Sequence, residues 1–424
     1  MAEIADSFGL LRLPDSIAFG DGSRAGIPTT VAALGSRALV VCDPFLASSE
    51  PFAELLQGLD DAGIVYTVDS HVVPELPVKV VEEAIERART ASPDVIIGFG
   101  GGSALDLAKL IALGLAHGTP LNRFYGENLV PGPVLPLVAV PTTSGTGSEV
   151  TPVAVLADPD RELKVGISSP YLIPRAAVVD PRLMVGAPAS VTASAGADAL
   201  VHAIEAFTAQ KRTPTWNEQL PVFVGRNLLS STLALEAIAL IGRSLRRAVH
   251  NGEDFEARTQ MAYASLLAGM AFGTAGTHLS HAIQYPVGAL THTPHGLGTG
   301  MLLPYVMQAI LASDAGHLAE IAGALGVGPG SGSTEEAAQA AVEEVASIMA
   351  DIGLPRDLAS MGVKEAQLPH IIELSLTVRR LVANSSLEPT EETVARIVRA
   401  AFDGDREALA PITTGGLNEG ETQK

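Results

Sequence analysis

Four of the chain's 10 histidines lie within eighteen residues of one another, in the segment THLSHAIQYPVGALTHTPHGLGTGMLL (residues 277–303). Among them, His281 and His295 have the spacing of a metal site. They stand fourteen residues apart, and one straight helix would separate them by about 21 Å, too far to share an ion. The chain must therefore turn between them, and we expect His281 to end one helix and His295 to begin the next. Four residues supply the helix breaks: Pro286, Gly288, Pro294 and Gly296.

A second segment, GADALVHAIEAF (residues 196–207), offers further ligands. Asp198 and His202 are four residues apart, so on a helix both side chains project from the same face. One Asp and three His form a nitrogen and oxygen site that suits Fe2+, Zn2+ or a neighbouring ion and leaves positions open for a substrate oxygen. The expected ligands are Asp198, His202, His281 and His295. Small neighbours would let another segment approach closely: Ala195, Gly196, Ala197, Ala199 and Ala203.

The elements that would position a cofactor lie earlier in the chain. A buried strand, Val95–Ile97, runs into three glycines and then a helical pattern. Gly100, Gly101 and Gly102 remove the side chains that would keep a pyrophosphate from the backbone, and the following helix start supplies positive dipole. The motif GGGSxxDxAK continues with Ser103, Asp106 and Lys109, although a surface ion pair is the alternative for the last two.

Two further strand ends carry polar side chains. The strand Pro136–Val140 leads into PTTSGTGSEVT, a loop that can donate many bonds to a ribose, a phosphate or a nicotinamide amide. The strand Arg37–Cys42 ends at Asp43, which can accept from a ribose 2′-hydroxyl and would repel a 2′-phosphate, or can simply cap a helix. The loop's hydroxyl-bearing residues are Thr142, Thr143, Ser144, Thr146, Ser148 and Thr151.

These motifs resemble those of the iron-containing alcohol dehydrogenase family, over nearly the whole chain. The shared features are the Asp-x-x-x-His pair, two His fourteen residues apart with a flanking PHG, and the two cofactor loops. The resemblance implies NAD rather than NADP, through Asp43, and a contact of Lys164 with the cofactor ribose. It also implies a metal that is Fe2+ or Zn2+.

The pattern changes near Gly186, where strand-like runs give way to long helical ones. We therefore expect an α/β, Rossmann-like dinucleotide-binding domain over residues 1–186. An all-α metal-binding domain would follow over residues 187–424, as in the dehydroquinate synthase-like fold of the iron-containing alcohol dehydrogenases. The chemistry would take place in the cleft between the two domains.

The chain departs from the family pattern where many members carry a third histidine that relays the alcohol proton. That position is Tyr285, so Tyr285, His278, His292, a ribose hydroxyl or water could each take part. The segment AGTHLSHAIQYP and the extra residues 216–231 are more similar to the hydroxyacid-oxoacid transhydrogenase branch. Arg379 and Arg380 could meet a substrate carboxylate, but a solvated helix face is the favoured interpretation.

Composition narrows the possible partners and compartment. The formal net charge of −20 argues against nucleic acid and anionic membranes as partners. A single cysteine, Cys42, excludes a disulfide within the chain and fits a reducing compartment. The start of the chain has no signal-peptide core and no uninterrupted apolar run approaches a membrane span. We expect a cytoplasmic homodimer or higher homo-oligomer.

The predicted activity is the interconversion of an alcohol or short hydroxy acid with its aldehyde or ketone, with a metal and NAD. The alternatives are a hydroxyacid-oxoacid transhydrogenase, a dehydroquinate synthase-type lyase that uses NAD transiently, and a non-catalytic nucleotide-binding protein. Net NADH formation from a simple alcohol would separate the first interpretation from the last two.

Overall fold

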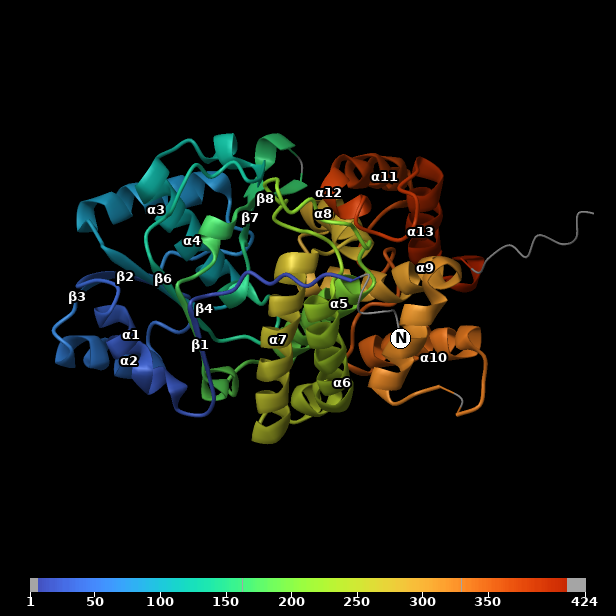
Figure 1. Cartoon of the computed structure of the whole chain (residues 1–424), viewed down its shortest axis with the longest axis horizontal. Coiled ribbons are helices and arrows are strands. Elements are labelled where there is room, and N and C mark those ends of the chain that lie inside the picture. The colour runs from blue at the N-terminus through green and yellow to red at the C-terminus, as the bar shows by residue number, and fades with distance from the viewer. Residues whose placement is uncertain (1–6, 162, 329, 410–424) are drawn as a thin grey trace, which may run out of the picture.

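The computed structural model describes residues 7–161, 163–328 and 330–409. Figure 1 shows two parts side by side, an α/β half in blue to green and a helical half in light green to red. The fold class expected from the sequence is confirmed, because a parallel sheet forms the first half and helices form the second.

The α/β half is built on a six-stranded sheet with the order β1-β9-β6-β4-β2-β3, in which every pairing is parallel. Parallel strands share a direction, so the loops that follow β2, β4 and β6 meet at one edge of the sheet. The strands are β1 (Ser16–Phe19), β2 (Arg37–Cys42), β3 (Val65–Asp69), β4 (Val95–Gly100), β6 (Leu137–Pro141) and β9 (Ala176–Val179).

Helices cover both faces of this sheet, which explains the continuous apolar runs of its central strands. On one face, α1 and α2 pack against Val40 and Ile97. On the other, α3 and α4 pack against Leu39 and Ile96. The helices are α1 (Ile27–Ala32), α2 (Glu50–Asp61), α3 (Val78–Ala91) and α4 (Gly102–His117).

A small second sheet, of order β5-β8-β7, was not predicted from the sequence. Its strands are β5 (Gly126–Glu127), β7 (Val153–Asp158) and β8 (Leu163–Ser168). Lys164, which belongs to none of the sequence motifs, therefore lies on strand β8, and β8 pairs with β7 in antiparallel fashion.

The helical half has its own core, formed mainly by α5, α6, α7, α9 and α10. The first helices are α5 (Ala189–Phe207), α6 (Leu228–His250), α7 (Phe255–Ala275) and α8 (Leu279–Thr291). The later ones are α9 (His295–Leu325), α10 (Thr334–Asp351), α11 (Leu368–Thr377), α12 (Arg379–Val382) and α13 (Glu391–Asp403).

The structure corrects the expected position of His281. It lies in the first turn of α8 rather than at the end of a helix, and Pro286 and Gly288 lie inside the same helix. A proline within a helix removes one backbone hydrogen bond but need not end the helix. The break comes later, at His292, which has a left-handed φ of 54°, and at Pro294, which precedes α9.

The chain's first described residues cross to the helical half before they enter the sheet. The Leu228 amide donates to the carbonyl of Phe8 (3.0 Å), and Arg12 Nη1 donates to the carbonyl of Val222 (2.9 Å). Figure 1 shows this segment as a blue trace that runs between the halves. The change from strands to helices falls between Val179 and Ala189, while the boundary at residue 186 stays a prediction.

Among the described residues, two helices, α6 and α9, are long and apolar enough to cross a membrane by length and composition alone. The apolar stretch of α9 is 78% buried inside the protein and that of α6 is 44% buried. Both helices contribute to the core of the helical half, and a core helix satisfies the same length and composition test.

Candidate active site

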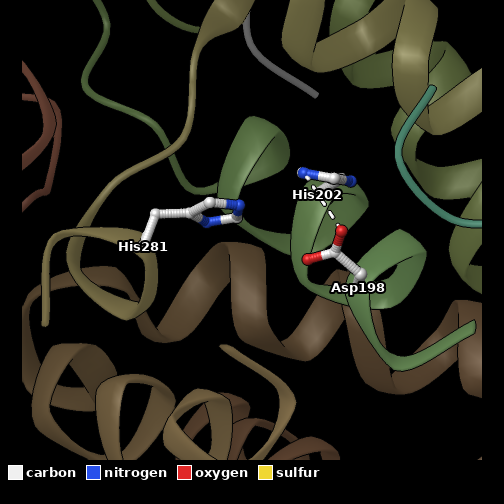
Figure 2. A group of neighbouring side chains, drawn as sticks. All are labelled: Asp198, His202 and His281. Atoms are coloured by element: carbon white, nitrogen blue, oxygen red, sulfur yellow. Dashed lines mark ion pairs between the residues drawn. The ribbon is translucent and has the colours of Figure 1, made fainter. Parts of the chain in front are cut away.

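Three of the four expected metal ligands converge on one point. Asp198 and His202 lie one turn apart on α5, and His281 reaches them from the start of α8 (Figure 2). One ligand atom from each lies within 4.8 Å of those of the other two. The distance from His202 Nε2 to Asp198 Oδ2 is 3.9 Å, so these atoms flank a space without bonding to each other.

The second ring nitrogen of each histidine fixes the direction of the first. His202 Nδ1 donates to the carbonyl of Gly145 (3.2 Å), which leaves Nε2 facing Asp198. His281 Nδ1 lies 2.7 Å from Glu205 Oε2, and its buried Nε2 has no hydrogen-bond partner among the described residues. A buried nitrogen without a partner, aimed at a carboxylate and an imidazole, is what a metal site requires of its ligands.

His295, the fourth expected ligand, lies beside this cluster. Its Nε2 is 3.9 Å from Asp198 Oδ1, and its ring centroid is 5.3 Å from that of His281. Asp198 Oδ1 also accepts a hydrogen bond from the hydroxyl of Thr299 (2.9 Å). The structure thus brings all four side chains to one place, with His295 at its margin.

Small residues allow α9 to approach α5 closely enough for this arrangement. A Cβ on Gly296 would lie 2.1 Å from the carbonyl oxygen of Ser194 and 2.8 Å from Asp198 Cβ. On the same face of α9, a Cβ on Gly300 would lie 2.8 Å from that of Ala197. The close approach expected from the small residues around Asp198 is therefore present.

Glu205 is a site residue that no sequence motif indicated. It is fully buried and accepts from the amides of His278 and Ser280 (both 2.7 Å) as well as from His281 Nδ1. Burial by itself would raise the pKa of Glu205, but His278, His281 and these hydrogen bonds hold that pKa well below its usual value. The sequence signal that could have indicated Glu205 is its position three residues after His202 on the same helix.

The glycine loop after β4 packs against the loops that follow β2 and β6. A Cβ on Gly100, whose φ is 155°, would lie 3.2 Å from Asp43 Cβ. A Cβ on Gly102 would lie 2.6 Å from the side chain of Thr146, and one on Gly101 would lie 3.5 Å from that of Thr143. The loops predicted to hold a dinucleotide therefore meet at one edge of the sheet.

Several of the predicted cofactor residues brace these loops from within. Ser148 Oγ donates to Asp106 Oδ1 (2.6 Å), and the Val155 amide donates to the other carboxylate oxygen (3.0 Å). Lys109 Nζ donates to the carbonyl and hydroxyl of Thr151 (2.9 and 3.2 Å). Burial lowers the pKa of Lys109 to about 8. Lys109 is thus a buried brace and not a surface ion pair.

One cavity connects the cofactor loops with the metal-ligand cluster. The predicted residues that line it are Gly102, Ser103, Asp106, Thr146, Ser148, Thr151, Lys164, Asp198, His202, His281, His295 and Tyr285. Lys164 lies in the cavity with its Nζ 2.6 Å from Glu75 Oε2, as an ion pair. Asp43, Gly100, Gly101 and Thr142 are not among the residues that line this cavity, and Thr143 and Ser144 line a smaller neighbouring one.

Of the three proton-relay candidates, the structure brings only Tyr285 to the cavity. His278 is buried behind the site, where its Nε2 lies 2.9 Å from the hydroxyl of Thr208. His292 is exposed at the end of α8. Neither has access to a substrate oxygen in this arrangement.

The sequence favoured a solvated helix face for both Arg379 and Arg380. This expectation is correct for Arg379 and wrong for Arg380. Arg379 is exposed, whereas Arg380 lines the cavity beside Tyr285. Three aromatic side chains, Phe223, Phe272 and Tyr285, line the same cavity. No sequence pattern indicated these contacts, because they come from separate helices and from the loop before α6.

Comparisons with known proteins identify the family. Residues 14–181 match the family model described as iron-containing alcohol dehydrogenase, and residues 192–402 match the C-terminal model of the Fe-containing alcohol dehydrogenase family. The chain is 39% identical to long-chain-alcohol dehydrogenase 1 of Geobacillus thermodenitrificans over 91% of this chain and 94% of that protein. It is 35% identical to the NAD-dependent methanol dehydrogenase of Bacillus methanolicus, over 84% and 90%.

Among solved structures, that of 1,3-propanediol oxidoreductase superposes with a TM-score of 0.86 at 34% identity, over 93% of this chain and 100% of that one. These relatives are alcohol dehydrogenases, which does not favour the transhydrogenase alternative. Because the two family models together match residues 14–181 and 192–402, the chain belongs to the iron-containing alcohol dehydrogenase family.

Proposed function

We propose that this chain interconverts a small alcohol and its aldehyde by hydride transfer to and from NAD, at the cavity between its two halves. The observation that carries the proposal is His281 Nε2, which has no hydrogen-bond partner in the described part of the chain and is buried beside Asp198 and His202, in the same cavity that the cofactor loops line. In the oxidative direction a hydride leaves the alcohol carbon for nicotinamide C4, and the hydroxyl proton leaves separately.

Asp198, His202, His281 and His295 would hold the divalent cation, and the family assignment makes Fe2+ the first choice over Zn2+. When bound, such an ion supplies a Lewis acid that lowers the pKa of a substrate hydroxyl. The chain's own part is to fix the ligand nitrogens, through Glu205 on His281 and the Gly145 carbonyl on His202.

The dinucleotide would lie along the edge where β2, β4 and β6 end. Gly100, Gly101 and Gly102 would admit the pyrophosphate to the start of α4, and Lys164 would reach the ribose next to the nicotinamide. Asp43 follows β2 at this edge, where its carboxylate would accept from the other ribose and repel a 2′-phosphate. We therefore infer a preference for NAD over NADP.

Tyr285 is the proposed side chain that positions the water to which the alcohol loses its proton. Burial raises the pKa of Tyr285, so its hydroxyl stays protonated and would donate a hydrogen bond to that water rather than accept the proton itself. A ribose hydroxyl or water would then carry the proton to solvent.

The decisive experiment uses purified full-length protein loaded with Fe2+ without oxygen, mixed with NAD and a panel of short alcohols. We expect net NADH absorbance with at least one alcohol, and loss of both bound iron and activity in His281→Ala. Tight NAD binding without net NADH from any alcohol would instead favour the lyase or the non-catalytic protein.

We also propose that the protein is a homo-oligomer in the cytoplasm. Light scattering of the purified protein tests the oligomeric state.

A further inference from the structure

The cavity contains one positive charge that the proposed reaction does not use. Arg380 lines it, on the short helix α12, next to Tyr285 and Phe223. The guanidinium carbon lies 4.3 Å from the centre of the Phe223 ring, which is within cation–π range. The guanidinium itself carries five N–H donors.

Within the described part of the chain, Arg380 has no closely bonded anion. Its ion pair joins Nε to Glu127 Oε1 at 3.8 Å, which is too long for a hydrogen bond. The other oxygen of Glu127 accepts from the amide of Val222 (3.0 Å), which holds that carboxylate away. Burial lowers the pKa of the Arg380 guanidinium, although 28% of the side chain stays exposed, and no close anion offsets this shift.

The other charged side chains that line the cavity are each accounted for. Lys164 pairs with Glu75 at 2.6 Å, and Asp106 accepts from Ser148 and from the backbone. Asp198 belongs to the metal-ligand cluster. Arg380 is therefore the charged lining residue, among those described, whose hydrogen-bonding capacity is open to a ligand.

We propose that Arg380 makes this enzyme prefer an aldehyde or alcohol that carries an anionic group, a carboxylate or a sulfonate, at the end away from the reacting carbon. The proposal rests on the proposed function, since it places the substrate between the metal ligands and Arg380. A guanidinium binds either anion through two parallel N–H donors, and such charge-assisted bonds are stronger than neutral ones. Phe223, Phe272 and Tyr285 line the same cavity, and these aromatic side chains suit a short hydrocarbon linker between the anionic group and the reacting carbon.

The test compares shape-matched aldehydes under NADH with the iron-loaded protein. The carboxylate pair is 4-oxobutanoate and 4-methylpentanal, and the sulfonate pair is sulfoacetaldehyde and 3,3-dimethylbutanal. We expect kcat/KM to favour at least one anion over its neutral partner by about 10-fold or more. The pair with the larger ratio identifies the anion. In Arg380→Met we expect this ratio to fall by about 10- to 100-fold, with partial recovery in Arg380→Lys.

The matched control is Arg379→Met, which removes the exposed neighbouring arginine and should leave the ratio within about twofold. A second readout does not depend on turnover: calorimetric binding of butanoate should weaken in Arg380→Met and not in Arg379→Met. Equal ratios in wild type and Arg380→Met, or unchanged butanoate binding, would overturn the proposal even if neutral aldehydes are reduced. Butanoate binding that depends on Arg380, without reduction of any aldehyde, would support it while the proposed reaction fails.

Discussion

A single buried carboxylate organises the metal-ligand cluster. Glu205 receives two backbone amides at the start of α8 and the Nδ1 proton of His281. It therefore fixes where α8 begins and which nitrogen of His281 faces Asp198 and His202. Partners of this kind orient a metal-binding histidine and commonly contribute 10- to 100-fold to metal affinity.

Replacement of Glu205 by Gln tests this role. A Gln side chain has one acceptor oxygen and turns an NH2 group towards at least one of the three donors, so His281 loses its fixed orientation. We expect the affinity for Fe2+ or Co2+ to fall by about 10- to 100-fold in competition with a chelator. Glu236→Gln, at an exposed position on α6, is the control and should bind metal as the wild type does. Unchanged affinity in Glu205→Gln would show that the carboxylate only supports the fold.

A second buried acid, Glu149, predicts how stability varies with pH. Burial raises the pKa of Glu149 to about 7, and its own backbone and Lys109 offset only part of this shift. A carboxyl whose folded pKa lies above its unfolded value binds more protons when folded, so its contribution is complete below about pH 4.5 and is lost as the pH rises through 7. We expect Glu149→Gln to gain stability relative to wild type between pH 5 and pH 8, by about 1–3 kcal/mol, in urea unfolding. A constant difference across that range would contradict the assignment.

Sequence patterns predicted those helices and strands whose bounds depend on residues close by in the sequence. Strand β2 was predicted with its observed bounds, because an apolar run and flanking turns are local signals. The edge strand β3 was missed, since Val65 is 67% exposed and the segment lacks a buried run. The start of α8 was also misplaced, because the carboxylate that caps it lies on a different helix.

The contact between α5 and α9 leads to a prediction about packing. Gly296→Ala would place a methyl group 2.1 Å from the Ser194 carbonyl oxygen, so one helix must move. We expect a loss of about 1–3 kcal/mol in unfolding free energy and a reduced metal content, because His295 and Asp198 separate. Gly323→Ala on the same helix is the control: a Cβ there would meet nothing within 4 Å, and the substitution should be neutral or stabilising by about 0.5–1 kcal/mol. Equal behaviour of the two variants in thermal melts would contradict the close approach.

Across the full chain, sequence patterns indicated two halves and a site between them but not the contacts that join the halves. Arg379 and Arg380 are neighbours on one short helix, yet one is exposed and the other lines the cavity. No pattern in four residues distinguishes them, because the surroundings come from distant segments such as Phe223 and Glu127. The four candidate metal ligands were easier to select from the sequence, since their types and spacing stand out before any packing is known, and the structure brings their side chains together.

The segment that crosses between the halves gives the last prediction. Arg12 donates to the carbonyls of Pro221 and Val222, and the ring of Phe8 lies 6.1 Å from that of Trp216, the only tryptophan in the chain. Trp216 fluorescence therefore reports whether this segment is attached to the helical half. In Arg12→Ala, the partly buried carbonyl of Val222 and the exposed carbonyl of Pro221 lose their donor, at about 1–3 kcal/mol in total.

We expect the Trp216 signal of Arg12→Ala to change at a lower urea concentration than its far-ultraviolet circular dichroism, because the segment detaches before the halves unfold. In the wild type and in Arg396→Ala, which replaces an exposed arginine on α13, the two transitions should coincide. Coincident transitions in all three proteins would mean that the crossing segment unfolds together with the helices it contacts. In that case the attachment of the two halves is shared among many contacts and does not depend on Arg12.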